Sequence, residues 1–236
     1  INNRANEMNN EFLSTIKIMP ATVKEIPFIV ETIIAAEKSG TDIIGTCRFF
    51  DLSETEYSEM IVELLNDNSP GYDYALSSYL VAFDGDKPVG AFGAWLEGED
   101  GVSSIILKIN AFIALIEREK VIEIKNRLQQ LGGQSFSRDE GALQFEFAYV
   151  IPEYTGKGIL QQIMAQQVKR YKNTGKNFNK AQVILAKENL PAIKSYQRFG
   201  FKITETIMVD EKLAELFSYR ERVLMECSEE MLVKYF

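Results

Sequence analysis

The sequence predicts a mixed α/β (α+β) protein, because short strand-like runs alternate with amphipathic helical segments. Three segments support this class: a β-hairpin around residues 84–87, a strand–turn–helix unit over residues 145–171, and a pair of strands near the C-terminus. A chain of 236 residues with 46% hydrophobic residues can bury a sizeable core as one domain, or as a domain with an insertion.

The first part of the chain predicts a short strand followed by two helices. The asparagine-rich residues 1–10 are expected to form a frayed lead-in, and residues 16–18 belong to a short strand. A Thr-x-x-Glu capping box at residues 22–25 opens an amphipathic helix that Gly40 closes, and residues 53–56 repeat the pattern before a second helix. Each helix has one apolar face, so both are interpreted as packing helices.

A β-hairpin comes next. Residues 78–83 and 88–96 read as its strands, and the Asp-Gly-Asp-Lys sequence between them is typical of a turn. Trp95 and Glu97 stand at the end of the second strand, and Trp95 is interpreted as core filler. Residues 103–131 then carry apolar residues at helical spacing with charges between them, which predicts one long amphipathic helix or two shorter ones.

The segment from Phe145 to Tyr171 predicts a strand, a glycine turn and a helix. Its first residues are aromatic and β-branched, and Pro152 ends the strand because proline has no N–H to donate. Gly156 and Gly158 allow a tight turn before apolar residues recur at helical spacing. Unpaired N–H groups and the positive end of the helix dipole converge at this turn, which suits a phosphate.

The turn does not match two common phosphate-binding fingerprints. It lacks the spacing of a P-loop, and Gln161 occupies the position of the third glycine of a dinucleotide site. A Gly-x-Gly pattern alone is also common in ordinary turns that precede a helix and bind no ligand, so an ordinary turn stays open as the alternative.

A further strand and helix and a closing strand pair follow. Residues 182–186 form the strand, and the next helix has Pro191 in its first turn and Gly200 as its C-terminal cap. Residues 201–209 and 222–227 read as the closing pair, joined by a segment that suits a short helix.

Two motifs resemble the Gcn5-related N-acetyltransferase (GNAT) superfamily. Pro-Glu-Tyr-x-Gly-Lys-Gly-Ile at residues 152–159 resembles its acyl-CoA pyrophosphate loop. Asn-x-x-Ala-x-x-x-Tyr-x-x-x-Gly-Phe at residues 189–201 resembles its thiolate-facing helix. Two motifs in this order and separation are far more specific than either alone, and the resemblance is close over residues 142–204.

The resemblance implies a mixed, mostly antiparallel central sheet with helices on both faces, in a single domain over residues 1–236. The family's usual path between these strands is short, so residues 100–141 are interpreted as a helical insertion. A lid over the active site or a dimer contact is favoured for it, because a long apolar stripe outside the standard core needs a partner. Packing across the sheet of its own chain is the alternative.

The resemblance also implies that the strand–turn–helix unit binds acyl-CoA. Backbone groups of Tyr149, Val150 and Ile151 would pair with the pantetheine arm as an added strand does. Asn189 would hydrogen-bond this arm or cap its own helix, and the two roles are compatible. The pyrophosphate would be held by the amides of the turn, which belong to Thr155, Gly156, Lys157, Gly158, Ile159 and Leu160.

Two positions of this turn depart from the family pattern. Thr155 stands where Arg or Gln is favoured, which removes a polar side chain that helps to hold the turn. Leu160 stands where Gly or Ala is favoured, which adds bulk where the backbone approaches phosphate. Lys157 compensates with a point charge.

Acyl transfer to an amine needs a neutral amine and a proton for the leaving thiolate. A lysine-like amine has a pKa of about 10.4, so a base or a water chain must take its proton. By its position in the second motif, Tyr196 would be the general acid that gives a proton to the thiolate. The alternative is an aromatic side chain that merely packs under the sheet.

Glu146 is the best single candidate for the base. Along a regular strand Phe145, Phe147 and Tyr149 share one face. Glu146 therefore points to the other face, where partial burial would raise its pKa toward a useful value. The alternative is a solvated or salt-bridged glutamate.

Composition limits the classes of function. The formal charge of −8 and the sequence pI of about 4.9 disfavour nucleic acid or an anionic membrane as partner and leave room for a cationic acceptor. No apolar run reaches the ~18 residues of a membrane span, and no signal-peptide pattern opens the chain. With only Cys47 and Cys227, a reduced cytoplasmic location is expected. The absence of histidine excludes histidine-dependent hydrolases and metal sites, and no metal is expected.

These observations predict an acyl-CoA-dependent N-acyltransferase that passes acetyl from acetyl-CoA directly to a small-molecule or peptide amine. Neither cysteine has the basic partner that a nucleophilic thiol needs, so no covalent enzyme intermediate is expected. The alternative is a non-catalytic GNAT-like acyl-CoA sensor or a dimerising scaffold, and a homodimer is compatible with either function.

Overall fold

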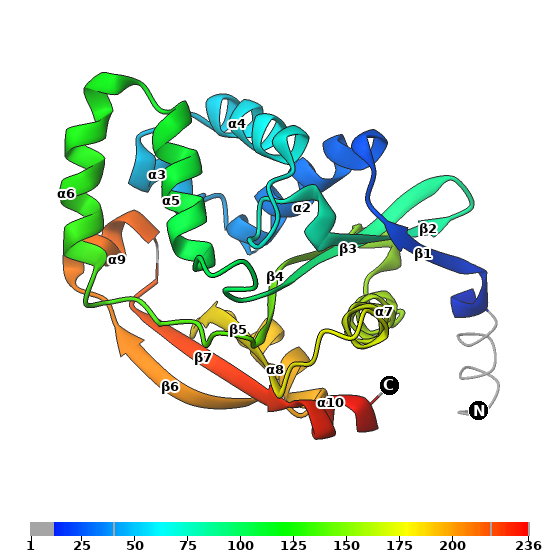
Figure 1. Ribbon diagram of the computed structural model, residues 1–236. Coiled ribbons are helices and arrows are strands. Elements are labelled where there is room, and N and C mark those ends of the chain that lie inside the picture. The colour runs from blue at the N-terminus through cyan, green and yellow to red at the C-terminus, as the bar shows by residue number, and fades with distance from the viewer. Residues whose placement is uncertain (1–11, 40, 218, 236) are drawn as a thin grey trace.

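The computed structural model describes residues 12–39, 41–217 and 219–235, so the expected lead-in at residues 1–10 lies outside the described part. The centre is a seven-stranded sheet with the order β1-β2-β3-β4-β5-β7-β6 (Figure 1). Neighbouring strands are antiparallel except β4 and β5, which run parallel, so the predicted mixed and mostly antiparallel sheet is confirmed. The strands are β1 (Ile16–Pro20), β2 (Tyr79–Asp84), β3 (Lys87–Leu96), β4 (Leu143–Val150), β5 (Lys180–Ala186), β6 (Lys202–Met208) and β7 (Glu221–Ser228).

Helices cover both faces of this sheet, with α7, α8 and α10 on one face and α2 to α6 on the other (Figure 1). No helix in the described ranges is long and apolar enough to cross a bilayer. The α-helices are α2 (Ile26–Lys38), α3 (Gly45–Phe50), α4 (Glu54–Asp67), α5 (Ser104–Leu115), α6 (Val121–Leu131), α7 (Ile159–Asn173), α8 (Leu190–Arg198), α9 (Glu211–Phe217) and α10 (Glu229–Lys234). The 3-10 turns are η1 (Val23–Glu25), η2 (Leu76–Ser78), η3 (Arg118–Lys120) and η4 (Pro152–Tyr154).

Both predicted capping boxes are present. Thr22 and Glu25 exchange hydrogen bonds around η1, which leads directly into α2. At α4 the N–H of Ser53 donates to the Glu56 carboxylate at 2.7 Å, and the N–H of Glu56 donates back to the Ser53 hydroxyl at 3.2 Å. Each box satisfies N–H groups that a helix start leaves without partners, which is why the helices begin at these residues.

Among the helices whose bounds are given above, α3 and α10 were not predicted from the sequence. α3 has six residues and is too short to show a helical period. α10 lies in the C-terminal stretch that had no assigned role, and the Ser228 side chain caps it by accepting from the N–H of Met231 at 3.3 Å.

The helical segment between β3 and β4 packs against helices of its own chain. Phe112 of α5 is fully buried, with its ring 4.8 Å from that of Phe50 and 5.1 Å from that of Tyr74. Arg127 of α6 donates to the carbonyl of Phe49 at 2.6 Å and so ties α6 to the last turn of α3. Much of the apolar stripe is thus covered by α3 and α4, not by the sheet, and needs no lid or dimer to bury it. The apolar residues of this segment that stay exposed include Ile105, Ile106 and Ile122.

A β-bulge at Phe147 breaks the alternation of β4. The register between β3 and β4 shifts by one residue here, and Phe147 has a φ of +51°, which is unusual for a residue with a side chain. Phe145 packs on Phe92, whereas Tyr149 packs on Phe28 of α2 on the opposite face. The prediction that Phe145, Phe147 and Tyr149 share one face is therefore wrong, because one extra residue reverses the alternation beyond it.

Candidate active site

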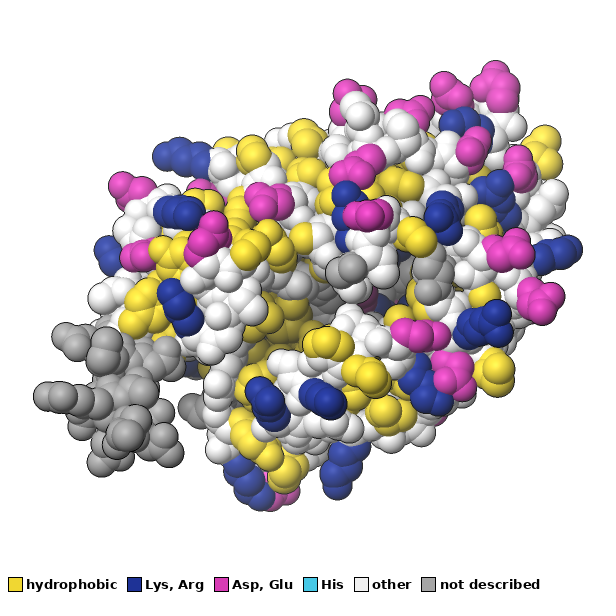
Figure 2. Space-filling view, turned by 180° about the vertical axis from the view of Figure 1, so that it is seen from behind, with side chains coloured by type: hydrophobic (Ala, Val, Ile, Leu, Met, Phe, Trp, Pro, Cys, Tyr) yellow, Lys and Arg dark blue, Asp and Glu magenta, His cyan; other side chains and the backbone are white. Residues whose placement is uncertain are grey.

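β4 and β5 run side by side but pair over only three residues each. Residues 143–145 pair with residues 181–183, and beyond them the two strands have no register with each other. Their outer edges stay paired, β4 with β3 as far as Val150 and β5 with β7 as far as Ala186. The two facing edges therefore border a gap and leave backbone groups without a strand partner. Figure 2, the view from behind, shows a hollow with hydrophobic side chains on its floor.

The loop after β4 ends in an open helix N-terminus. Gly156 and Gly158 have φ angles of +78° and +85°, which glycine adopts at little cost. Gly158 is the N-cap of α7, and no side chain caps this helix. The first N–H groups of α7 and the positive end of its dipole are therefore free to meet an anionic group.

Aromatic side chains hold this loop in place. The hydroxyl of Tyr154 donates to Asp84 at 2.6 Å and so fixes the loop to the β2–β3 hairpin. The ammonium of Lys157 lies 4.8 Å from the ring centroids of both Phe12 and Tyr154. These cation–π contacts keep a positive charge beside the glycine turn.

The two positions that depart from the family pattern are accommodated. The hydroxyl of Thr155 lies 3.4 Å from the carbonyl oxygen of Ile151, which gives the turn a weak internal hydrogen bond. Leu160 is partly buried and packs against the hydrophobic core, so the core takes up part of its bulk.

Tyr196 of α8 lies beneath the sheet. It is 8% exposed, and its ring centroid is 5.3 Å from that of Phe201 and 6.4 Å from that of Phe92. Phe92 pairs with Ala148 of β4, in the part of β4 that borders the gap. The ring thus packs under the sheet, as one of its two interpretations predicted, next to the place where the general acid would be needed.

The hydroxyl of Tyr196 has no hydrogen-bond partner in the described part of the chain, yet its oxygen atom is not fully buried. The fully buried side-chain atoms without a hydrogen bond there are the carboxylate oxygens of Asp73 and Oε1 of Gln167. The hydroxyl of Tyr196 therefore reaches solvent. Burial, and then the charge of Glu146, raises the pKa of Tyr196 above its ordinary value, so the hydroxyl keeps its proton at neutral pH.

Asn189 connects the two sides of the gap. Its Oδ1 accepts from the N–H of Ala192 at 3.3 Å, so the predicted capping of α8 is present. Its Nδ2 lies 3.4 Å from the hydroxyl of Ser39, just after the end of α2. The last turn of α2 therefore lies close to the N-terminus of α8.

Glu146 is held in an ion pair. Its Oε2 lies 2.5 Å from Nη2 of Arg138, and the two side chains are 22% and 14% exposed. Arg138 also donates to Gln144 at 2.6 Å and stacks 5.0 Å from the ring of Trp95, which is buried as core filler. Of the two interpretations of Glu146, the structure contains the salt-bridged one, and a role as base requires that this pair opens.

Sequence reasoning missed a second set of polar residues, on the α2 side of the gap. Lys108 of α5 forms an ion pair with the buried carboxylate of Asp73, whose pKa is raised by burial despite this partner. The same ammonium lies 5.2 Å from the ring of Tyr74 and 6.0 Å from the ring of Phe147. Glu37 of α2 belongs to this region as well. These residues come from distant segments and form no local motif, so no sequence pattern pointed to them.

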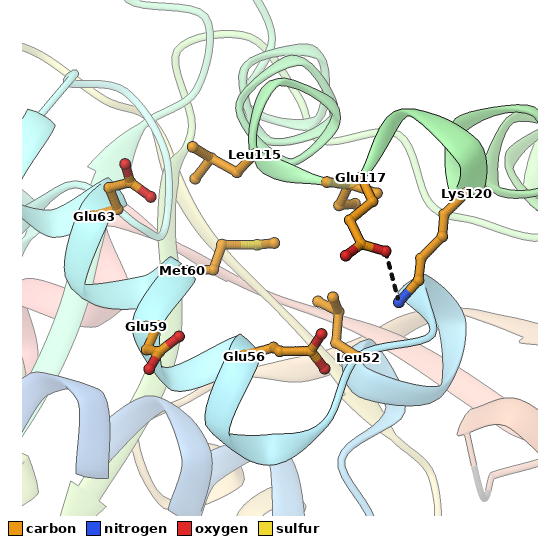
Figure 3. A pocket seen from close by; sticks show the side chains of 9 residues that line it. Leu52, Glu56, Glu59, Met60, Glu63, Leu115, Glu117 and Lys120 are labelled. Carbon is orange, nitrogen blue, oxygen red and sulfur yellow. Dashed lines mark ion pairs between the residues drawn. The ribbon is translucent and has the colours of Figure 1, made fainter.

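A separate pocket of about 190 Å³ lies between α4 and the turn η3. Figure 3 shows Met60 and Leu115 at its centre, with glutamates on its rim and the ion pair between Glu117 and Lys120 at one side. None of its lining residues belongs to β4, β5, α7 or α8, so it is distinct from the gap.

Comparison with known proteins agrees with this geometry. A sequence model of the Acetyltransferase (GNAT) family matches residues 48–201, which is more than half of the chain. No curated protein sequence matches the chain. An N-acetyltransferase from Staphylococcus aureus Mu50 superposes with a TM-score of 0.62 at 15% identity, over 89% of this chain and 100% of that chain.

Two further solved structures share the fold. An acetyltransferase superposes with a TM-score of 0.53 at 17% identity, over 90% of this chain and 98% of that one. Ard1 from Thermoplasma volcanium superposes with a TM-score of 0.51 at 12% identity, over 91% of this chain and 97% of that one. At such identities the likeness establishes the architecture alone.

Proposed function

Because the chain belongs to the acetyltransferase (GNAT) family, we propose that it is an acyl-CoA-dependent N-acyltransferase that passes acetyl from acetyl-CoA to a primary amine. The observation that carries this proposal is the parting of β4 and β5 beside an uncapped helix N-terminus. A strand edge that can accept an amide-containing arm and a turn that can accept a diphosphate are the two features that acyl-CoA requires.

Acyl-CoA would lie with its pantetheine arm along the open edge of β4, formed by Tyr149, Val150 and Ile151. Its pyrophosphate would meet the backbone N–H groups from Thr155 to Leu160, with the ammonium of Lys157 as a nearby point charge. Asn189 would offer its side chain to the arm from the other side of the gap. Since the cap of α8 uses Oδ1 and one N–H of Nδ2 meets the Ser39 hydroxyl, the second N–H is the group available to the arm.

Tyr196 would act as the general acid. Its hydroxyl has no partner within the described residues, keeps its proton at neutral pH and belongs to the second family motif. The proton goes to the CoA thiolate as the carbon–sulfur bond breaks. For the base, Glu146 stays a prediction that depends on release of Arg138.

Transfer would be direct, without an acyl-enzyme. Both cysteines are buried, and burial raises the pKa of Cys47 to about 12 and that of Cys227 to about 11. Neither thiol therefore ionises at neutral pH, as a covalent nucleophile must. Kinetics with a panel of amines should give intersecting lines in double-reciprocal plots, and parallel lines would indicate an acyl-enzyme.

The proposal is tested by thiol release from acetyl-CoA in the presence of small amines and of peptides with a free N-terminus. Calorimetric titration with CoA runs in parallel. Amine-dependent release of CoA together with binding supports the proposal. Binding without release for every amine would favour the rival function, a non-catalytic acyl-CoA sensor.

A further inference from the structure

The last turn of α2, which lies close to the gap, carries a carboxylate. Glu37 is the last residue but one of α2, the helix that packs over β4. Two residues later, Ser39 meets the side chain of Asn189 at 3.4 Å, and Asn189 opens α8 directly after β5. The end of α2 therefore lies between the strand on one side of the gap and the helix on the other.

Neutral hydrogen-bond donors fix the Glu37 carboxylate. Its Oε1 accepts from the Thr46 hydroxyl at 2.6 Å and from the Tyr57 hydroxyl at 2.8 Å, and its Oε2 accepts from the Thr46 N–H at 3.2 Å. The Tyr57 hydroxyl also meets that of Tyr74 at 2.6 Å. Since the Tyr57 hydroxyl donates to Glu37, the Tyr74 hydroxyl must donate to that of Tyr57. Both hydroxyl groups therefore direct their hydrogen bonds toward the carboxylate.

Glu37 shares its neighbours with the residues that border the gap. The ring of Tyr74 packs edge-on against that of Phe147, the bulge residue of β4, at 5.6 Å. The pKa of Tyr219 is raised above its ordinary value chiefly by burial, and the charges of Glu37 and Glu146 add to this rise while Arg222 opposes it. Tyr57 and Tyr74 thus connect Glu37 to Phe147, the residue that follows Glu146 in β4.

Glu37 differs from the other carboxylates of this region because it has no cationic partner. Glu146 is paired with Arg138, and Asp73 is paired with Lys108. Within the described residues no ammonium or guanidinium nitrogen lies within 4 Å of Glu37. The charge of Lys108 acts on Glu37 from beyond ion-pair distance, so a carboxylate in this partly buried position favours a cationic ligand.

Glu37 is also not fully enclosed by protein. Glu37 is only partly buried by exposed area, yet desolvation is the largest cause that raises its pKa above the ordinary value of 4.5. A group that keeps contact with solvent while deep in protein is typical of the wall of a cleft.

We propose that Glu37 receives the ammonium of the acceptor and removes its proton, while Thr46 and Tyr57 hold the carboxylate in place. This inference rests on the proposed function and names its base. Primary amines that are cationic at neutral pH are the acceptors that such a site selects.

The protons of the step balance. The acceptor ammonium gives one proton to Glu37, and the neutral nitrogen attacks the thioester carbon. The carbon–sulfur bond then breaks, and the thiolate takes a proton from Tyr196. The new amide nitrogen loses its second proton, which restores the Tyr196 hydroxyl directly or through solvent. Glu37 releases its proton to solvent, so one proton leaves in each turnover.

The pH dependence of activity should follow Glu37. Because the carboxylate must be ionised, kcat/KM rises with pH along an acid limb that ends at the pKa of Glu37, above 4.5. Other titratable or charged groups interact electrostatically with Glu37. They are Cys47 of α3, Tyr57 of α4, Tyr74 before η2, Lys108 of α5 and Tyr219 of the β6–β7 connection.

The first test replaces Glu37 with glutamine. Glu37→Gln should lower kcat/KM for the amine by about 100-fold or more and abolish the acid limb, since general-base catalysis typically contributes ~10²–10⁴-fold. The KM for acetyl-CoA should not change. Glu59→Gln, an exposed glutamate of α4, is the matched control and should retain wild-type activity.

The second test keeps the carboxylate and changes its pKa. Tyr57→Phe removes a donor that lowers the pKa of Glu37, so the acid limb should move to higher pH. A purely structural role of Tyr57 would lower activity without moving the limb. This variant decides the question even where Glu37→Gln does not fold.

The outcomes separate the two proposals. If the wild-type protein acetylates no amine, both the proposed function and the role of Glu37 are refuted. An active wild type whose Glu37→Gln variant keeps its acid limb, or whose Tyr57→Phe variant leaves the limb in place, overturns the Glu37 inference alone. Loss of the limb in Glu146→Gln but not in Glu37→Gln would assign the base to Glu146.

Discussion

Replacing Tyr196 with phenylalanine should separate catalysis from folding, because its hydroxyl has no hydrogen-bond partner within the described residues. The ring contacts at 5.3 Å and 6.4 Å do not involve this oxygen and are kept in Tyr196→Phe. No protein donor or acceptor loses a partner, so the free energy of unfolding should change by less than about 0.5 kcal/mol.

The effect on turnover should be much larger. General-acid catalysis typically contributes ~10²–10⁴-fold, and the lower end suits a thiol leaving group, whose reference pKa is about 8.5. A loss of about 100-fold in kcat corresponds to ~2.7 kcal/mol of transition-state stabilisation. Since the raised pKa of Tyr196 keeps it protonated over the working range, the loss should narrow only as pH rises past the thiol pKa and the thiolate leaves unaided.

Thiol release under saturating amine measures kcat, and calorimetry measures CoA affinity, which should stay nearly unchanged. Tyr171→Phe is the matched control. The hydroxyl of Tyr171 donates to the carbonyl of Ala94 at 2.8 Å, so its removal should cost about 1 kcal/mol of stability and leave turnover unaffected. Equal kcat in Tyr196→Phe and the wild type would refute the general-acid assignment.

Three further predictions concern the turn, a cap and a buried charge. Gly158→Ala should lower the free energy of unfolding by about 1–2 kcal/mol, because Gly158 has a φ of +85°. It should also weaken CoA binding more than Gly156→Ala, since Gly158 and not Gly156 is the N-cap of α7. Equal CoA affinities of the two variants in calorimetry would argue against a pyrophosphate at this N-terminus. Ser53→Ala should lower the free energy of unfolding by about 1 kcal/mol in urea titrations, and an unchanged midpoint would mean that the capping box adds no stability. The pKa of Glu37 is higher in the folded than in the unfolded protein, so its contribution to stability is full below the unfolded pKa of about 4.3 and is lost as pH rises through the folded pKa. Glu37→Gln should therefore gain stability relative to the wild type between pH 4 and pH 7. A stability difference that does not depend on pH would contradict the raised pKa.

Local patterns in the chain indicated most of the elements. The two capping boxes, the turn at residues 84–87 and the glycine turn before α7 each depend on contacts within a few residues, and each is present. α3 escaped prediction because its six residues carry no period, and it is fixed by packing of Phe49 and Phe50.

The faces of the residues that follow Glu146 in β4 could not be read from the sequence. A single bulge residue, Phe147, depends on the register between β3 and β4, which is set by two strands about fifty residues apart. The partner of Glu146 could not be read from the sequence either, since Arg138 reaches it from the irregular connection before β4.

The sequence by itself determined the fold class, the family motifs and the identity of the residues at the glycine turn and at Tyr196, because these follow from spacing along one segment. Only the tertiary structure decided that Glu146 and Asp73 have cationic partners, whereas the Glu37 carboxylate accepts from neutral donors. Ser39 at the end of α2 comes close to Asn189, and Glu37 is connected through Tyr57 and Tyr74 to Phe147, only when α2 packs over β4. The pKa of a carboxyl group depends on such neighbours, not on its position in the chain.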